Sequence, residues 1–216
     1  MKDFITTYRL TDSEGVKHRI GIWYDEYAED PRDWDNVTEI HTFHPRYKLG
    51  DDNKKMSACE FTEELLRSYG IRFGKNESAG ELREKLSLIK DCVWYPVVIY
   101  DHSQVTVSYG DITQFPDWRW DASDIGFVYV TRQMLETKTG RTDITDENWK
   151  DIAEEYIKAE IKMLDQWSLG ECYGYTDYEI QDDDEEVEID SCAGYMGDYE
   201  DIIKDIYPDA TDIEEV

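Results

Sequence analysis

Hydrophobic and polar residues alternate near the start of the chain in the manner of β-strands. Ile20, Ile22 and Tyr24 are separated by Gly21 and Trp23, and a Thr-Asp-Ser-Glu-Gly turn joins this run to the apolar residues of 4–10. The pattern predicts an antiparallel hairpin with one buried face. Residues 25–56 follow neither the helical nor the strand period, so they predict a long ordered loop with short elements, a kind of segment that often carries function.

Helical periodicity follows the loop. It predicts helices over 58–69 and 78–89, and Ser78 and Glu81 have the spacing of a capping box. Apolar runs then predict strands over 93–100, 105–109 and 127–131. The clearest element is a helix over 146–168, where apolar residues recur at steps of three and four, with Thr145 to cap its start and Gly170 to end it.

The last 46 residues alternate around an acidic run. Strands over 172–180 and 187–192 flank residues 181–186, which predicts a hairpin with an acidic tip, followed by a short helix over 199–206 and a frayed acidic tail. We therefore expect one α+β domain over 1–216, an antiparallel sheet of hairpins packed by three to four helices. The acidic hairpin, helix and tail of 171–216 form part of it.

The composition supplies enough apolar surface for a packed core, since 40% of the 216 residues are hydrophobic and 13% are aromatic. The first residues lack the apolar stretch of a signal peptide, and no apolar run reaches the roughly 18 residues of a membrane span. Four scattered cysteines form no C-x-x-C pair, which predicts reduced, mostly buried thiols. These features predict a cytoplasmic protein that binds no membrane.

Net charge is the outlying property of the chain. Lys and Arg number 23 against 51 Asp and Glu, which gives −28 at pH 7. Solubility of a small domain needs a magnitude of only about 2 to 8. Such a surface repels nucleic acid, which is recognised through clustered Lys and Arg. We therefore expect no direct binding of nucleic acid, and binding to a basic protein rather than catalysis.

The acidic excess is concentrated at the C-terminal end. Residues 171–216 hold 18 acidic residues and one lysine, a charge of −17, whereas residues 1–170 hold 33 acidic and 22 basic residues, a charge of −11. Carboxylates fixed on a hairpin could approximate the phosphates of DNA, and the alternative is a merely solvated surface. The candidate partner-binding residues are Glu171, Asp177, Glu179, Asp182, Asp183, Asp184, Glu185, Glu186, Glu188 and Asp190.

Histidines and aspartates elsewhere suggest a second kind of site. A divalent metal ion, the only cofactor for which the sequence offers candidates, would take His and Asp ligands from Asp35, His44, Asp51, Asp101, His102 and Asp121. The alternative is that His44 and His102 order the long loop through hydrogen bonds. Asp101, His102 and Ser103 are not a catalytic triad, because adjacent strand residues point to opposite faces.

The order of several motifs resembles a family of small acidic proteins of bacteriophages and other mobile elements. They include Asp30-Pro31-Arg32-Asp33-Trp34-Asp35-Asn36, His44-Pro45-Arg46-Tyr47-Lys48-Leu49-Gly50-Asp51, Tyr100-Asp101-His102-Ser103, Gly126-Phe127-Val128-Tyr129-Val130, Gly170-Glu171-Cys172-Tyr173-Gly174-Tyr175 and Asp190-Ser191-Cys192-Ala193-Gly194-Tyr195. The resemblance covers nearly the whole chain after residue 20. It implies an accessory protein that blocks host defence, such as an anti-CRISPR or anti-restriction protein.

Charge and resemblance together favour an inhibitor that binds the basic nucleic-acid channel of a host nuclease, a Cas effector or a restriction enzyme, in the cytoplasm of the infected bacterium. Two alternatives stay open. One is a metal-dependent enzyme that acts through the His and Asp residues, and the other is a metal-stabilised regulatory or scaffold protein of phage development. Metal content and chelator sensitivity separate these alternatives from the inhibitor.

Overall fold

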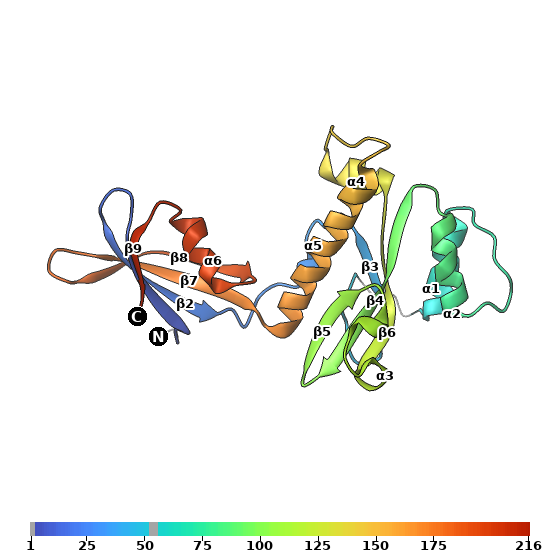
Figure 1. Cartoon of the computed structure of the whole chain (residues 1–216), viewed down its shortest axis with the longest axis horizontal. Coiled ribbons are helices and arrows are strands. Elements are labelled where there is room, and N and C mark those ends of the chain that lie inside the picture. The colour runs from blue at the N-terminus through green and yellow to red at the C-terminus, as the bar shows by residue number, and fades with distance from the viewer. Residues whose placement is uncertain (1–2, 52–55) are drawn as a thin grey trace. The chain divides into compact units, whose positions relative to one another are not determined.

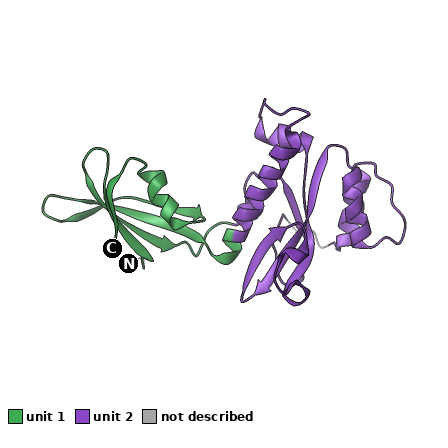
Figure 2. Ribbon diagram, in the orientation of Figure 1, with its two compact units in different colours: residues 1–29, 166–216 green, residues 30–165 purple. Residues whose placement is uncertain are grey.

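The computed structural model describes residues 3–51 and 56–216. In these residues nine strands form two antiparallel sheets, accompanied by six α-helices (Figure 1), so the expected α+β class is confirmed. Contacts divide the chain into two compact units, coloured separately in Figure 2: unit 1 is residues 1–29 and 166–216, and unit 2 is residues 30–165. The single-domain organisation over 1–216 stays a prediction. Each unit has its own sheet.

The sheet of unit 1 joins the two ends of the chain. Its strands are β1 (Thr6–Thr11), β2 (Lys17–Tyr24), β7 (Cys172–Ile180), β8 (Glu186–Met196) and β9 (Thr211–Glu215), in the order β8-β7-β2-β1-β9, and all neighbours are antiparallel. Both predicted hairpins, β1–β2 and β7–β8, are present. They lie side by side because β2 pairs with β7 along its whole length.

One face of this sheet is covered by α6 (Tyr199–Ile206) (Figure 1). Alternation in β2 directs Ile20 and Ile22 to the helix, where they share a core with Ile202 and Ile203 of α6. On the opposite face Gly21 and Gly174 leave room for aromatic rings. A Cβ at Gly21 would lie 2.5 Å from the Phe4 ring, and one at Gly174 would lie 2.3 Å from the Trp23 ring.

The expected frayed tail is wrong, because residues 211–215 form β9. This strand pairs with β1 in the register Tyr8 to Glu215 and Thr11 to Thr211. The backbone N–H of Val216 also donates to the carbonyl of Thr7 (2.8 Å). Acidic sequence argued for fraying, but an open edge of β1 offered backbone partners that no local pattern reveals.

The sheet of unit 2 has the order β3-β6-β4-β5. Its strands are β3 (Glu39–Thr42), β4 (Cys92–His102), β5 (Gln104–Tyr109) and β6 (Ala122–Thr131). The helices are α1 (Ala58–Ser68), α2 (Ala79–Glu84), α3 (Trp118–Asp121), α4 (Arg132–Thr139) and α5 (Trp149–Leu169), the last of which continues into unit 1.

Helices cover both faces of this sheet (Figure 1). Phe127 and Tyr129 of β6 pack with Leu66 of α1 and Leu82 of α2. Intervening Val128 is also buried and faces the other side by strand alternation. At the β5 edge of the sheet the Val107 N–H donates to Asp165 of α5 (2.6 Å). Burial on both faces explains why β6 is almost continuously apolar.

The sequence did not locate every element of unit 2. The loop with short elements expected over 25–56 contains β3 and a 3-10 turn (Pro31–Asp33), while its residues 52–55 lie outside the described residues. Four residues are too few to show a period, and β3 is held by pairing with β6, far along the chain. Helices α3 and α4 were also missed. The helix predicted over 78–89 begins with its capping box but becomes a 3-10 turn (Lys85–Leu88).

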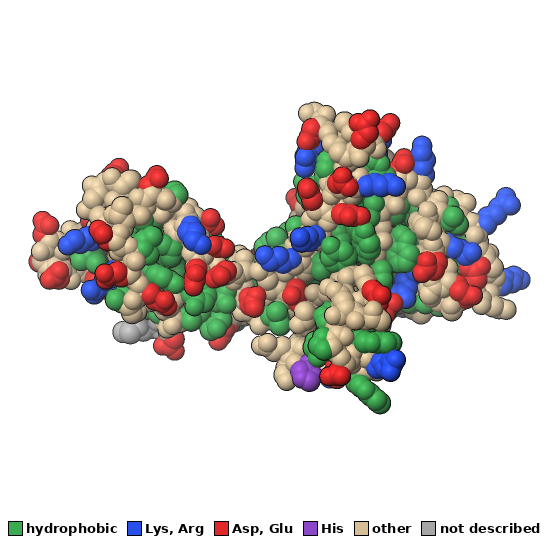
Figure 3. Space-filling view, viewed as in Figure 1, with side chains coloured by type: hydrophobic (Ala, Val, Ile, Leu, Met, Phe, Trp, Pro, Cys, Tyr) green, Lys and Arg blue, Asp and Glu red, His purple; other side chains and the backbone are tan. Residues whose placement is uncertain are grey.

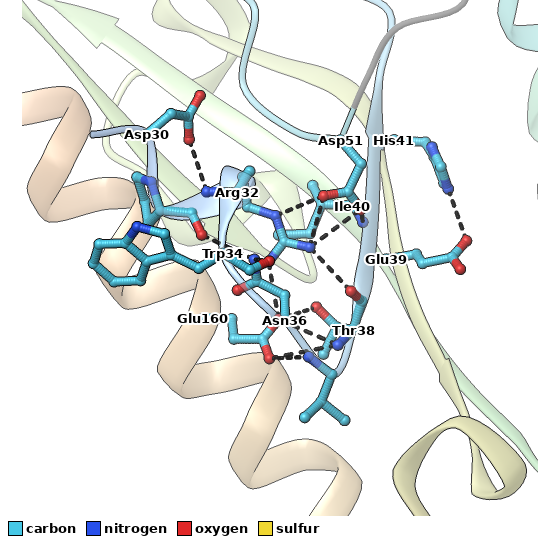
Figure 4. A network of polar contacts seen from close by, with 12 residues as sticks. Asp30, Arg32, Trp34, Asn36, Thr38, Glu39, Ile40, His41, Asp51 and Glu160 are labelled. Carbon is cyan, nitrogen blue, oxygen red and sulfur yellow. Dashed lines mark hydrogen bonds and ion pairs between the residues drawn. The ribbon is translucent and has the colours of Figure 1, made fainter. Parts of the chain in front are cut away.

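A buried guanidinium ties the loop of unit 2 to its long helix (Figure 4). Arg32 is 7% exposed, and its Nε and Nη2 donate to Asp51 at 2.9 and 3.1 Å. Its Nη1 donates to Glu160 of α5 (2.9 Å), and Nη2 also donates to the Thr38 carbonyl (3.0 Å). Each of the three guanidinium nitrogens thus donates to at least one acceptor.

The carboxylates of this network carry backbone hydrogen bonds as well. Glu160 accepts from the Val37 N–H (2.7 Å) and the Thr38 hydroxyl (2.6 Å), and Asp51 accepts from the Ile40 N–H (2.7 Å). A buried charge left without its partner is costly, whereas a fully satisfied network fixes one arrangement. The network therefore fixes residues 31–51 against α5.

We expect Glu160→Gln to lower the free energy of unfolding by about 1.5–3 kcal/mol, because it removes one of the two carboxylates that neutralise buried Arg32 and leaves Asp51 as its remaining counter-charge. Glu63→Gln is the matched control: it removes the half-buried i,i+4 partner of exposed Arg67 and should cost less than about 0.5 kcal/mol. Urea unfolding followed by circular dichroism measures both. Equal effects of the two substitutions would contradict the structural role of the network.

A second prediction concerns acid stability. Hydrogen bonds from His41 and from the Tyr129 hydroxyl lower the pKa of Glu39 to about 2, against an ordinary value of 4.5. Because the folded chain keeps Glu39 ionised where the unfolded chain protonates it, its contribution is complete above about pH 4.5 and disappears as the pH falls toward about 2. The Glu39→Gln variant should therefore be less stable than the unchanged chain at pH 7. Unfolding curves at successively lower pH should show the difference in free energy of unfolding between the two becoming smaller. A difference independent of pH would contradict this.

Candidate protein-binding surface

Two turns and the start of β9 bring acidic residues to one end of the unit 1 sheet. Lys17 pairs with both Thr11 and Ile180, and Thr11 pairs with Thr211. The β1–β2 turn, the β7–β8 turn and the start of β9 therefore lie beside one another. We call the exposed carboxylates there the acidic end: Glu14, Asp182, Asp183, Asp184, Glu185 and Asp212.

The acidic end belongs to the more strongly charged unit. Residues 1–29 and 166–216 hold 24 acidic and 5 basic residues, a charge of −19, whereas residues 30–165 hold 27 acidic and 18 basic residues, a charge of −9. Unit 1 is the smaller of the two, with 80 of the 216 residues. Carboxylates are spread over the face of unit 1 that Figure 3 shows.

The β7–β8 turn is an ordered structure. The Gln181 N–H donates to the Glu185 carbonyl (2.9 Å), and the Asp184 N–H donates to the Gln181 carbonyl (3.0 Å). Asp184 has a φ of 62°, a left-handed conformation that Asp tolerates better than most residues. Asp182, Asp183, Asp184 and Glu185 are thus exposed on a closed turn, as the sequence suggested.

Other predicted partner-binding residues have structural partners. Glu186 pairs with Arg19 (Nη2 to Oε2, 2.6 Å), and this hydrogen-bonded pair lowers the pKa of Glu186. Asp190 accepts from the Tyr175 hydroxyl (2.5 Å). Glu171 and Glu179 are half-buried, while Glu188 is exposed. The candidate surface therefore narrows to the turn and the outer side of β8.

Asp177 is not a partner-binding residue, because it is 2% exposed. Its Oδ1 lies 3.0 Å from His18 Nδ1, and its Oδ2 accepts from the Tyr207 hydroxyl (2.6 Å). Burial, with this hydrogen bond, raises the pKa of Tyr207. Strand alternation places Asp177 opposite Ile20 on the helix-covered face. The sequence pattern alone could not reveal this, since an aspartate in an acidic hairpin was expected to face water.

Aromatic residues of β7 pack beneath the β7–β8 hairpin. Tyr173 and Tyr175 are buried in the core and anchor β7, whereas Tyr178 and Ile180 are half-buried. The four cysteines were expected to be mostly buried thiols, but Cys192, on the edge strand β8, is exposed. The other cysteines are free thiols that are buried or half-buried.

The candidate metal ligands are engaged in separate interactions. Asp51 belongs to the Arg32 network, and Asp35 is exposed on the loop after the 3-10 turn. Asp101 accepts from the Tyr47 hydroxyl (2.6 Å) and from Arg46 (2.9 Å). Among residues 3–51 and 56–216, no three His, Cys, Asp or Glu side chains are arranged to hold a metal ion.

The two candidate histidines differ in role. His44 Nδ1 accepts from the backbone N–H groups of Arg46 and Tyr47 at 3.3 and 3.2 Å, so it orders the loop, as the alternative interpretation expected. His102 bonds a residue outside that loop: its Nδ1 lies 2.9 Å from Asp121, and its side chain is 62% exposed. The two histidines therefore belong to separate local structures: His44 lies in the loop and His102 lies beside α3.

Fold and surface together define an acidic α+β protein whose most negative unit is a sheet with an acidic end. None of the described helices combines the length and the hydrophobicity of a membrane span. Comparison with known proteins finds no family model, no curated protein and no solved structure that matches the chain.

The structural role of the buried cluster of His18, Asp177 and Tyr207 can be tested by substitution. Tyr207→Phe removes the hydroxyl that bonds Asp177 and should lower the free energy of unfolding by about 1.5–3 kcal/mol, the usual range for a hydrogen bond to a charged group. Tyr27→Phe is the control, because Tyr27 is 91% exposed, and it should change stability by less than about 0.5 kcal/mol. Denaturant unfolding that fails to separate the two variants would contradict the assignment.

Proposed function

We propose that the chain is an inhibitor encoded by a bacteriophage or another mobile element, which binds the basic nucleic-acid channel of a host defence nuclease. The nuclease is an RNA-guided Cas effector or a restriction enzyme in the cytoplasm of the infected bacterium. One observation carries the proposal: unit 1 holds −19 on 80 residues, with carboxylates fixed at one end of a hydrogen-bonded sheet. The resemblance to acidic phage proteins is in keeping with it.

Charge spacing supports a mimic built from several elements. Alternate residues of a strand lie about 6.8 Å apart on one face, whereas one strand of DNA carries a charge every 3.4 Å along its axis. A single acidic strand thus supplies half the density of one DNA strand. The β1–β2 turn, the β7–β8 turn and β9 together raise the local density, which favours the acidic end over any one segment.

Long-range attraction would act mainly on the rate of association. Complementary charge can raise association rate constants from about 10⁵–10⁶ to 10⁸–10⁹ M⁻¹s⁻¹ at low salt. At an ionic strength of about 0.15 M the Debye length is about 8 Å, so only charges close to the partner remain effective. Inhibition by such a surface should weaken as salt is added, and duplex DNA should compete with it.

The test is to neutralise the tip and measure inhibition of DNA binding by purified Cas effectors and restriction nucleases. The variant is Asp182→Asn, Asp183→Asn, Asp184→Asn, Glu185→Gln and Glu188→Gln; Glu186 is left intact because it pairs with Arg19. At about 0.3 kcal/mol for each charge, affinity should fall by about tenfold. The loss should shrink at high salt.

The control removes the same charge from exposed positions of unit 2. It combines Asp35→Asn, Glu64→Gln, Glu84→Gln, Glu147→Gln and Glu155→Gln, all of which are exposed. If both variants lose affinity equally, net charge rather than the acidic end carries binding. If the inhibited nuclease still binds DNA with unchanged affinity, the chain does not act as a DNA mimic.

A further inference from the structure

Strand β8 is a long and open edge of the unit 1 sheet. It has 11 residues, pairs only with β7 in the described part of the chain, and is exposed from residue 186 to residue 194. The opposite edge, β9, has five residues. Proteins usually keep edge strands short or covered, because unpaired backbone groups recruit other strands. An exposed edge strand as long as β8 is therefore unusual.

Hydrogen bonding in the turn shows which backbone groups of β8 point outward. The pair Gln181 and Glu185 is hydrogen-bonded, and antiparallel pairs alternate between bonded and non-bonded. Glu179 and Val187 therefore exchange hydrogen bonds, whereas Glu186 and Glu188 direct their N–H and C=O groups away from β7. Two successive outward-facing residues are the minimum template for an added strand.

From residue 186 to residue 188 the side chains of this template alternate between acidic and β-branched, and Val187 between the two glutamates is 44% exposed. Ile189, at the register shift, is 48% exposed, and Asp190 lies opposite Asp177 on the other face from Glu188. Exposed β-branched residues suit a strand that gains a neighbour, since cross-strand pairs stabilise a sheet. The complementary strand alternates basic and apolar residues.

A second copy of β8 fits this edge poorly. The antiparallel register that would place Val187 opposite Ile189 also places Glu186 opposite Asp190 and Glu188 opposite itself, and like charges directly opposite each other are destabilising. Register shifts near Ile189 and Ala193 further bend the strand. The occupant is thus a short segment rather than another long flat strand.

We propose that residues 186–190 bind a short basic segment of the partner, which adds to the sheet as a sixth strand. The backbone groups of Glu186 and Glu188 pair with it, and the carboxylates contact its Lys or Arg side chains. That the segment belongs to a nuclease rests on the proposed function. The strand addition itself rests on the geometry and charge of β8.

The first experiment uses peptides and the full chain, without any nuclease. The probe is the capped peptide Lys-Val-Lys-Val-Lys. It is compared with one version in which the backbone nitrogens of the valines are methylated and with another in which the backbone nitrogens of the lysines are methylated. All three peptides carry the same charge, but each methylated peptide has lost the backbone N–H donors along one of its two edges. Titration calorimetry should show affinity falling by about tenfold for one of the two methylated peptides, which matches two lost hydrogen bonds. Equal affinity of all three would overturn the proposal.

The second experiment changes β8. Glu188→Pro removes an outward N–H, which proline can do on an edge strand without breaking the β7 ladder. It should weaken binding of the unmethylated peptide by about tenfold, whereas Glu188→Gln, which keeps the N–H, should weaken it by about threefold. Equal losses would contradict strand addition. Thermal unfolding verifies that both variants fold; if Glu188→Pro does not, the peptide comparison on the unchanged chain decides.

Two further outcomes are informative. If the chain sediments as a dimer that Glu188→Pro converts to a monomer, a second copy occupies the edge and the proposal is wrong. If the peptide results hold but no nuclease is inhibited, the edge binds basic strands and only the proposed function fails. Inhibition that Glu188→Pro leaves unchanged, together with equal peptide affinities, rejects the edge and retains the inhibitor.

Discussion

The burial of Arg32 is the constraint on which the structure of unit 2 depends. A guanidinium in the interior needs acceptors on all sides, and Asp51, Glu160 and the Thr38 carbonyl supply them. The segment from Asp30 to Asp51 must therefore follow a defined path against α5. The polar motifs of 30–36 and 44–51 lie on this path, and the Arg32 network accounts for the roles of Arg32 and Asp51 within them.

Unit 1 also buries polar groups, and its carboxylates repel one another more strongly than those of unit 2. This repulsion opposes compaction. His18, Asp177 and Tyr207 form a buried polar cluster, and Arg19 pairs with Glu186 across the sheet. These contacts, with the core beneath α6, hold the strands that carry the exposed charge. The remaining carboxylates are therefore displayed on an ordered surface and not on a loose tail.

Acidic residues at both edges of the sheet also restrict what the protein can bind. Glu186 and Glu188 on β8, and Asp212 and Glu214 on β9, oppose pairing between copies because like charges would meet. The same residues attract basic surfaces. The same arrangement thus opposes pairing between copies of the chain and would favour a partner of opposite charge, as the proposed function requires.

Local patterns in the sequence determined the strands of both hairpins, the capped start of α2, most of α5 and the acidic β7–β8 turn, because alternation, capping residues and turn residues act over a few positions. Pairing between distant segments decided the rest. It made the tail into β9, brought Glu14 and Asp212 beside the β7–β8 turn, buried Asp177 and gave Asp51 to Arg32. Such contacts depend on which edges and charges remain unsatisfied after folding, and no window of neighbouring residues contains that information.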